Sequence, residues 1–228
     1  MANNYSAKYA IIVAGGKGLR MGNAMPKQFL PLSGKPVLYY AVKAFIDAFE
    51  DIKLILVLPN DQLSYAQMVL KEFTPRLDVT IVAGGETRFH SVQNGLQLVH
   101  GNSIVFIHDG VRPLVSVDLV RRCYWQAVEL GSAIPAIRVT DSMRIIEDDD
   151  SRPLDREYMR IIQTPQTFRS DIVLPAFEQE YQQAFTDEAT VVENTGTTVY
   201  LAEGERSNIK LTTVEDMLIA EALLKANQ

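Results

Sequence analysis

The sequence contains a single cysteine, Cys123, among 228 residues. One cysteine cannot build a disulfide framework or a thiolate metal site within one chain, which favours a reducing compartment. No segment approaches the roughly 20 apolar residues that span a bilayer, and the first residues show no apolar signal core. We therefore expect a soluble cytoplasmic protein that is not exported and does not bind membranes.

Positive charge is also scarce, because 22 Lys and Arg stand against 28 Asp and Glu, for a net charge of −6 at pH 7. Proteins that bind nucleic acids or anionic membranes depend on a basic surface, so the composition argues against both classes. An anionic ligand would then need a site where positive charge is locally concentrated. The stretch AGGKGLRMGNAMPKQF, residues 14–29, concentrates positive charge in this way, since Lys17, Arg20 and Lys27 stand among glycines.

Several familiar patterns are missing from this glycine-rich loop and from the rest of the chain. The loop lacks the third glycine of the dinucleotide fingerprint, and no G-x-x-x-x-G-K-[S/T] occurs for a P-loop. No His, Cys and Asp cluster has metal-ligand spacing, and no nucleophile–base pair is evident. Glycines still let backbone N–H groups approach an anion. The loop therefore predicts a polyphosphate cradle, with a surface loop carrying incidental lysines as the alternative.

Short apolar runs alternate with stretches of helical periodicity. Strands are predicted over residues 9–14, 53–59, 78–85 and 103–110, and helices over residues 36–49, 88–99 and 119–130. This alternation predicts one α/β domain over residues 1–228, with a Rossmann-like, mostly parallel sheet and helices on both faces. Ligands bind at the carboxyl ends of such strands, so residues 15–27, 84–91 and 108–112 should lie along one edge.

The alternation changes at about Ser142. Residues 142–168 predict two short strands around an acidic turn at residues 147–150, which would form a projecting β-arm at about residues 139–160. Near the end, residues 197–204 are strand-like and residues 212–226 predict a helix, with Thr212 and Glu215 spaced as a capping box. Trp125 and the aromatic side chains of YYAVKAF are interpreted as core.

The segments AGGKGLRMG and PKQF resemble the signature of the sugar-phosphate nucleotidyltransferases, and more narrowly of the 2-C-methyl-D-erythritol 4-phosphate cytidylyltransferase family. The resemblance continues in the family's order through GGETRFHSVQNGL, HDGVRP, VTDSM, LDRE, QTPQTF, TDEA and IKLTTVEDM, so it spans nearly the whole chain. It implies a homodimeric enzyme of the non-mevalonate isoprenoid pathway. This enzyme would transfer the cytidylyl group from CTP to methylerythritol phosphate and release pyrophosphate.

The resemblance also implies roles for individual residues. The CTP site would comprise Ala14, Gly15, Gly16, Gly18, Gly85, Glu86, Arg88 and Ser91. The catalytic cations would be Arg20, Lys27 and Lys210, with Lys27 ranked first because a fixed ammonium stabilises a crowded anionic transition state. Glu86 stands where some relatives have aspartate, so its reach toward the ribose differs by one methylene.

The sugar-phosphate side would comprise Asp109, Arg112, Ser142, Arg156, Thr164 and Thr186, some of them supplied across a dimer interface by the partner's arm. Ser142 replaces the family's usual threonine. No dedicated metal site is implied, because Mg²⁺ or another divalent cation is carried mainly on the CTP phosphates, with Asp109 as a possible ligand. The reacting phosphate oxygen is already ionised, so no general base is needed.

Each of these residues also has a purely structural interpretation. Asp109 suits a turn, Ser91 a local hydrogen bond, and Lys27 and Lys210 an exposed surface. Thr186 resembles a helix N-cap, with Asp187 and Glu188 in the first turn, and His108 is interpreted as structural. Two rival functions remain open, namely a pentitol-phosphate enzyme acting on ribitol 5-phosphate and a catalytically silent nucleotide-binding protein on the same fold.

Overall fold

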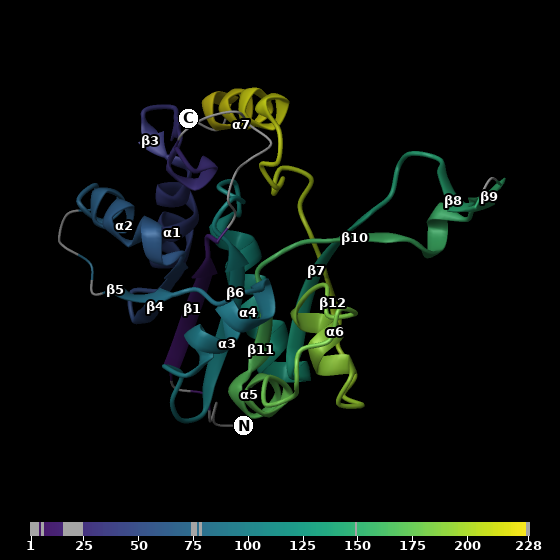
Figure 1. Ribbon diagram of the computed structural model, residues 1–228, viewed down its shortest axis with the longest axis horizontal. Helices are drawn as coiled ribbons and strands as arrows, with labels where there is room; N and C mark the ends of the chain where they lie inside the picture. Colours follow the sequence, from purple (N-terminus) through teal and green to yellow (C-terminus); the bar gives the residue numbers. More distant parts are fainter. Residues whose placement is uncertain are drawn as a thin grey trace.

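The computed structural model describes residues 5, 7–15, 25–73, 77, 79–148 and 150–226. Within these ranges the chain folds around a central sheet, and a slender arm projects from one side (Figure 1). None of the described helices is both long and apolar enough to cross a membrane.

The central sheet is mostly parallel, as the alternating pattern predicts. Its parallel part follows the order β5 (Val79–Ala83), β4 (Ile52–Leu58), β1 (Ala7–Val13) and β6 (Ser103–Asp109). Next to β6 lies β11 (Gln166–Arg169), which is antiparallel to both β6 and β7 (Ser132–Arg138). The strand β10 (Arg160–Ile162) is antiparallel to β7, whereas β12 (Leu201–Glu203) is parallel to it.

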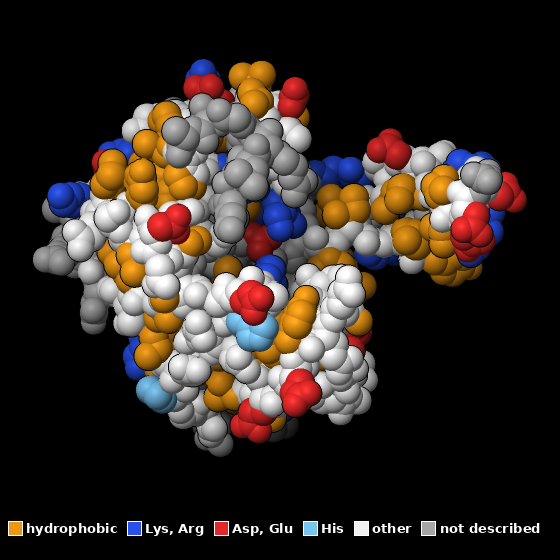
Figure 2. Space-filling view, in the orientation of Figure 1, with side chains coloured by type: hydrophobic (Ala, Val, Ile, Leu, Met, Phe, Trp, Pro, Cys, Tyr) orange, Lys and Arg blue, Asp and Glu red, His pale blue; other side chains and the backbone are white. Residues whose placement is uncertain are grey.

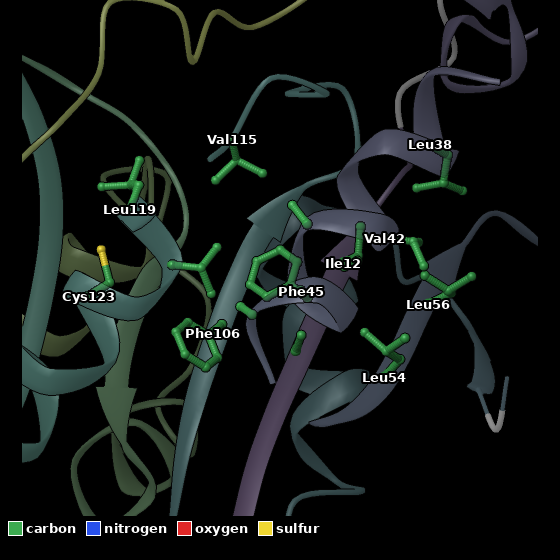
Figure 3. Close-up of a cluster of buried hydrophobic side chains, with 14 of the residues drawn as sticks. Ile12, Leu38, Val42, Phe45, Leu54, Leu56, Phe106, Val115, Leu119 and Cys123 are labelled. Atoms are coloured by element: carbon green, nitrogen blue, oxygen red, sulfur yellow. The ribbon is translucent and has the colours of Figure 1, made fainter. Parts of the chain in front are cut away.

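Helices cover both faces of this sheet, which confirms the predicted layering. One face carries α1 (Val37–Ala48), α2 (Leu63–Leu70) and α4 (Val117–Leu130), and the other carries α3 (Arg88–Leu96), α5 (Ser170–Ala176) and α6 (Glu188–Glu193). Successive strand residues point to opposite faces, so β1 gives Ile12 to the first core and Ile11 to the second. In the first core, shown in Figure 3, Phe45 of α1 meets Phe106 of β6 edge-on.

Shorter elements complete the domain near the carboxyl ends of the parallel strands. They are the 3-10 turns η2 (Lys27–Phe29) and η3 (Asn60–Gln62) and the two-residue strands β2 (Pro31–Leu32) and β3 (Lys35–Pro36), whereas a third 3-10 turn, η4 (Arg156–Tyr158), lies on the arm. The last helix, α7 (Val214–Ala226), packs Ala220 into a small third cluster with Leu32 and Val111. This cluster ties the end of the chain to the segment that follows β6.

The predicted arm is present as a β-hairpin. Strands β8 (Met143–Glu147) and β9 (Asp150–Leu154) are antiparallel, and within the described residues each pairs only with the other. The hairpin extends well away from the sheet (Figure 1) and carries apolar, acidic and basic side chains on its surface (Figure 2). Its exposed apolar residues include Ile146, and the adjoining Tyr158 is 85% exposed.

The structure contradicts the core assignment of Trp125, which is 62% exposed. In α4, Cys123, Tyr124 and Ala127 face the sheet and are buried. Trp125 follows Tyr124 by about 100° around the helix and so lies on the outer side, where its ring packs edge-on against Tyr124. Of the YYAVKAF aromatics, Phe45 is buried, while Tyr39 and Tyr40 are half-buried.

Two predicted helix caps are displaced by one residue. In α7 the reciprocal bonds join Thr213 and Asp216, not Thr212 and Glu215, because the Asp216 carboxylate accepts from the Thr213 N–H and the Thr213 hydroxyl accepts from the Asp216 N–H. In α6 the N-cap is Asp187 rather than Thr186, since the Asp187 carboxylate accepts from the N–H of Thr190.

Candidate functional site

A cavity of about 420 Å³ lies at the carboxyl ends of β1, β5 and β6. Its lining includes Ala14, Gly15, Lys27, Gly84, Gly85, Glu86, Thr87, Arg88, Ser91, Asp109 and Lys210. The three predicted strand-end segments therefore do share one edge, in the part of the chain that the structure describes. Gly16, Gly18 and Arg20 lie outside the described residues, so their roles stay predictions.

The buried carboxylate of Asp109 is the electrostatic centre of this cavity. Oδ2 lies 2.9 Å from Nζ of Lys210 and 3.5 Å from Nε of Arg112, and Oδ1 lies 3.1 Å from Nη2 of Arg88. Burial alone would raise the pKa of Asp109, but the three cations, with Arg88 and Lys210 acting most strongly, hold it well below its usual range. Asp109 is therefore ionised at neutral pH. In Figure 2, acidic and basic side chains meet in a central hollow of the surface.

Arg88 has a second acidic partner. Its Nη1 donates to Glu188, whose side chain is only 1% exposed, while Nη2 donates to Asp109. Burial alone would lower the pKa of Arg88, but these two carboxylates raise it. Burial also raises the pKa of Glu188, against the opposing effect of Arg88. Arg88 thus stays charged and is held between two acids.

Lys27 lines the cavity from η2, next to the end of β1. Its neighbour Gln28 is fully buried and donates from Nε2 to the carbonyl of Ala14 at 2.7 Å and to Oε1 of Gln62 at 2.6 Å. These bonds attach the PKQF segment to the end of β1 and to η3. Lys27 is therefore carried by a segment fixed to the sheet edge.

The loop after β5 is shaped by two close contacts. A Cβ on Gly85 would lie 2.4 Å from Cβ of His90, so only glycine fits this approach. The hydroxyl of Ser91 accepts from the N–H of Gly85 at 3.1 Å and donates to the carbonyl of Thr87 at 2.9 Å. Ser91 therefore makes the local hydrogen bonds of its structural interpretation while still lining the cavity.

Thr164 and Arg112 support Asp109 from behind and are not part of the cavity lining. The Thr164 hydroxyl accepts from the N–H of Asp109 at 3.0 Å and contacts Nδ1 of His108 at 3.0 Å. Nε2 of His108 lies 3.1 Å from the carbonyl of Arg112. A carbonyl only accepts, so Nε2 carries the proton, Nδ1 accepts, and Thr164 donates to the ring. Arg112, which is buried, also donates to the carbonyl of Asn208.

Three predicted substrate residues lie apart from this cavity within one chain. Ser142 and Arg156 are exposed on the arm, where Arg156 donates to the carbonyl of Thr140 at 2.6 Å. Thr186 is exposed just before α6 and lines a separate small depression with Arg88 and Glu188. The predicted roles of Ser142, Arg156 and Thr186 in binding substrate therefore stay predictions.

The acids at this cavity suit a cation that arrives with its own ligands. Within the described ranges, no three His, Cys, Asp or Glu side chains gather to hold a metal ion. The lining provides two carboxylates, Asp109 and Glu86. Mg²⁺ is usually bound through one or two carboxylates together with substrate phosphates and water. The donor set therefore fits a metal carried on a polyphosphate.

Comparison with known proteins decides the family. The family model of 2-C-methyl-D-erythritol 4-phosphate cytidylyltransferase matches residues 9–226. The chain belongs to this family. A cytidylyltransferase of Bacteroides fragilis is 48% identical over 215 residues, which cover 94% of this chain and 98% of the relative. One from Bacteroides thetaiotaomicron is 46% identical over 214 residues, with 94% and 98% covered.

Solved structures of cytidylyltransferases share the fold. The 4-diphosphocytidyl-2C-methyl-D-erythritol synthase of Anaerococcus prevotii superposes with a TM-score of 0.81 at 30% identity, over 96% of each chain. The 2-C-methyl-D-erythritol 4-phosphate cytidylyltransferase of Thermus thermophilus gives a TM-score of 0.75 at 29% identity, over 94% of this chain and 98% of that one. The family resemblance and the α/β fold class expected from the sequence are both confirmed.

Sequence reasoning missed several polar residues that hold this site together. Gln28, Gln166, Glu188 and Asn208 are all buried and hydrogen-bonded. Gln28 and Glu188 stand inside the quoted PKQF and TDEA segments, but a single polar letter gives no sign of burial. Only their position beside a strand end or a helix start could have drawn attention to them.

His108 should make the stability of the protein depend on pH. Burial lowers the pKa of His108 to about 4, whereas an unfolded histidine titrates near 6.5. The unfolded chain therefore takes up this proton first, and stability is lost as the pH falls from about 6.5 to 4. We expect this group to contribute a loss of about 2 kcal/mol between pH 7 and pH 4.5.

Urea unfolding of wild type and His108→Gln at both pH values measures this contribution. The variant should show the shallower pH dependence, and His100→Gln, which alters an exposed histidine, should follow the wild type. Equal slopes for His108→Gln and wild type would contradict the buried neutral histidine.

Proposed function

We propose that the protein transfers the cytidylyl group from CTP to 2-C-methyl-D-erythritol 4-phosphate. The products are pyrophosphate and 4-diphosphocytidyl-2-C-methyl-D-erythritol, a precursor in the non-mevalonate isoprenoid pathway. The observation that carries this proposal is the cavity at the strand ends, in which Arg88 and Lys210 pair with Asp109 and Lys27 is part of the same lining. Its setting in a chain that belongs to the cytidylyltransferase family over residues 9–226 supports the same reaction.

The reaction is an in-line displacement at the α-phosphorus of CTP. A phosphate oxygen of the sugar-alcohol substrate forms the new P–O bond, and the bond to the β-phosphate oxygen breaks as pyrophosphate leaves. We assign CTP to the side of the cavity formed by Ala14, Gly15, Gly85, Glu86 and Ser91. The glycines there carry no Cβ, so the substrate can approach the backbone closely.

Lys27 and Lys210 are assigned to the transferring phosphate, where fixed positive charge stabilises the anionic transition state. The Lys210 side chain is 44% exposed although its Nζ is paired with Asp109. Its flexible stem lets it leave this partner for a phosphate. Arg88 and Arg112 are less exposed and remain with Asp109, so the carboxylate stays paired when Lys210 moves.

A divalent cation, Mg²⁺ in the first instance, is assigned to the CTP phosphates, and Asp109 is the carboxylate of this chain that would help to hold it. When bound, the cation would neutralise the charge of the triphosphate. The protein residues bind and orient the two substrates around it.

We further propose that the enzyme is a cytoplasmic homodimer in which the arm of one subunit completes the site of the other. The single cysteine, Cys123, is buried and supports a reducing compartment. The exposed arm supports the dimer, since it projects from its own domain and holds Ser142 and Arg156 away from the cavity. Across a two-fold interface each arm would bring these side chains to the partner's sugar phosphate.

Pyrophosphate release from CTP and Mg²⁺ tests the reaction, with methylerythritol phosphate, ribitol 5-phosphate or no acceptor present. We expect a strong preference for methylerythritol phosphate. Preference for ribitol 5-phosphate would keep the chemistry and replace the substrate. Folded protein that binds CTP but is silent with both acceptors would contradict the proposed function.

Lys27→Ala should lower turnover by about 10²- to 10³-fold while changing CTP affinity far less, because a transition-state cation is worth more during the reaction than before it. Steady-state rates and calorimetric CTP binding measure the two effects. Lys71→Ala, which removes a lysine outside the cavity lining, serves as the control and should behave as wild type. Equal losses in turnover and affinity would make Lys27 a binding residue only.

Subunit mixing tests the action of Arg156 across the interface. Lys27→Ala and Arg156→Ala should each be nearly inactive, yet a refolded equimolar mixture should regain about a quarter of the wild-type rate. Half of the dimers are then mixed, and one of their two sites has both side chains. A mixture of Lys27→Ala with Lys210→Ala should regain nothing, because both lysines belong to the same subunit's cavity. Failure of the first mixture would place Arg156 in its own subunit's site.

A further inference from the structure

Glu188 is a buried carboxylate to which the proposed reaction gives no task. Its side chain is 1% exposed, and its Oε1 accepts from Nη1 of Arg88. Its other oxygen, Oε2, is buried and has no hydrogen-bond partner among the described residues. A buried charge with an unsatisfied oxygen opposes folding. The stability that Glu188 costs indicates that its contact with Arg88 serves another purpose.

A single glutamine, Gln166, holds the residues immediately before and after Glu188. Gln166 of β11 donates to the Asp187 carboxylate at 2.9 Å and accepts from the N–H of Ala189 at 2.8 Å. Gln166 is 1% exposed and pairs in register with Ile107 of β6, two residues before Asp109. The start of α6 is therefore attached to the strand pair that carries Asp109, and Glu188 has a defined position relative to it.

Arg88, the first residue of α3, bridges the two acids Glu188 and Asp109. Its planar guanidinium uses one terminal nitrogen for Glu188 and the other for Asp109, so two anchors define both its position and its plane. The charged groups around Glu188 are Arg88 from α3, Asp109 from β6 and Asp187 beside it in the chain. Arg88 is the cation of this set.

We propose that Glu188 is a positioning residue that holds Arg88 against Asp109, so that Asp109 keeps a fixed partner when Lys210 turns to the phosphate. This inference rests on the proposed function. It assigns to the TDEA segment a task distinct from contact with substrate, since Glu188 acts only through Arg88.

Glu188→Gln preserves the shape of the side chain and removes its charge. We expect kcat/KM for CTP to fall about 10- to 100-fold, as for the loss of a hydrogen bond to a charged group. The matched control is Glu193→Gln, which neutralises an exposed carboxylate of the same helix and should change kcat/KM by less than about twofold. An unaffected Glu188→Gln enzyme would overturn the proposal.

The same substitution in an Arg88→Met background separates positioning from a general structural role. There Glu188→Gln should cause no further loss of kcat/KM, and it should raise Tm because it removes an unpaired buried charge. In the wild-type background it should lower Tm. An equal loss of kcat/KM in both backgrounds would overturn the proposal. Arg88→Lys, which keeps the charge without the fork, provides a second background if Arg88→Met does not fold.

CTP binding by calorimetry keeps the test independent of turnover. If wild type releases no pyrophosphate with either acceptor, the proposed function fails, and the same set of variants is then compared by CTP affinity. A loss from Glu188→Gln that disappears in the Arg88→Met background supports the positioning role. An equal loss in both backgrounds, or none in either, contradicts it.

Discussion

A buried carboxylate surrounded by cations is the interaction on which the site depends. An unpaired charge taken out of water costs several kcal/mol, so Asp109 is tolerable only with its partners in place. These partners come from α3, from the segment after β6, and from the segment before α7. Pairing Asp109 therefore requires three distant parts of the chain to meet at one edge of the sheet. The geometry of the cavity follows from that requirement.

The same pairing concentrates positive charge in a protein with a net charge of −6. Within the described lining of the cavity, three cations, Lys27, Arg88 and Lys210, meet two carboxylates, Asp109 and Glu86, so the cations exceed the acids by one. The surplus is positive where a polyphosphate would lie, and the rest of the surface remains acidic. An anionic ligand is thus attracted to one place, which is how an acidic protein can bind a strongly charged substrate.

Much of the fold could be predicted because its signals are local. The apolar runs at residues 53–59 and 103–110 form buried strands, and the rule that ligands bind at strand ends placed Lys27, Arg88 and Asp109 together before their contacts were known. Motif resemblance supplied Lys210, which the strand pattern alone would have left as a surface lysine. The assignments for Gly16, Gly18 and Arg20 stay predictions.

The remaining features depend on tertiary contacts that a local pattern does not contain. Glu188 was expected to be a first-turn acid stabilising a helix dipole, yet it is buried because α6 packs its start against β11 and Arg88. Trp125 was expected in the core, but one residue of helical rotation decides between burial and exposure. Thr164 has contacts that the sequence pattern does not show, since its hydroxyl meets the Asp109 N–H and His108, and its contact with substrate stays a prediction.

The hydrogen bonds behind Asp109 run in a single direction. The Asp109 N–H donates to Thr164, Thr164 donates to His108, and His108 donates to the carbonyl of Arg112. Each interior member must therefore accept one hydrogen and donate another, which a hydroxyl and a neutral imidazole both do. At position 164, a purely donating side chain would point its hydrogen at the Asp109 N–H, and a purely accepting one would face Nδ1 of His108 with no hydrogen between them. The polarity of this relay, more than its shape, limits which residues can replace Thr164 or His108, and it couples the choice at one position to the choice at the other.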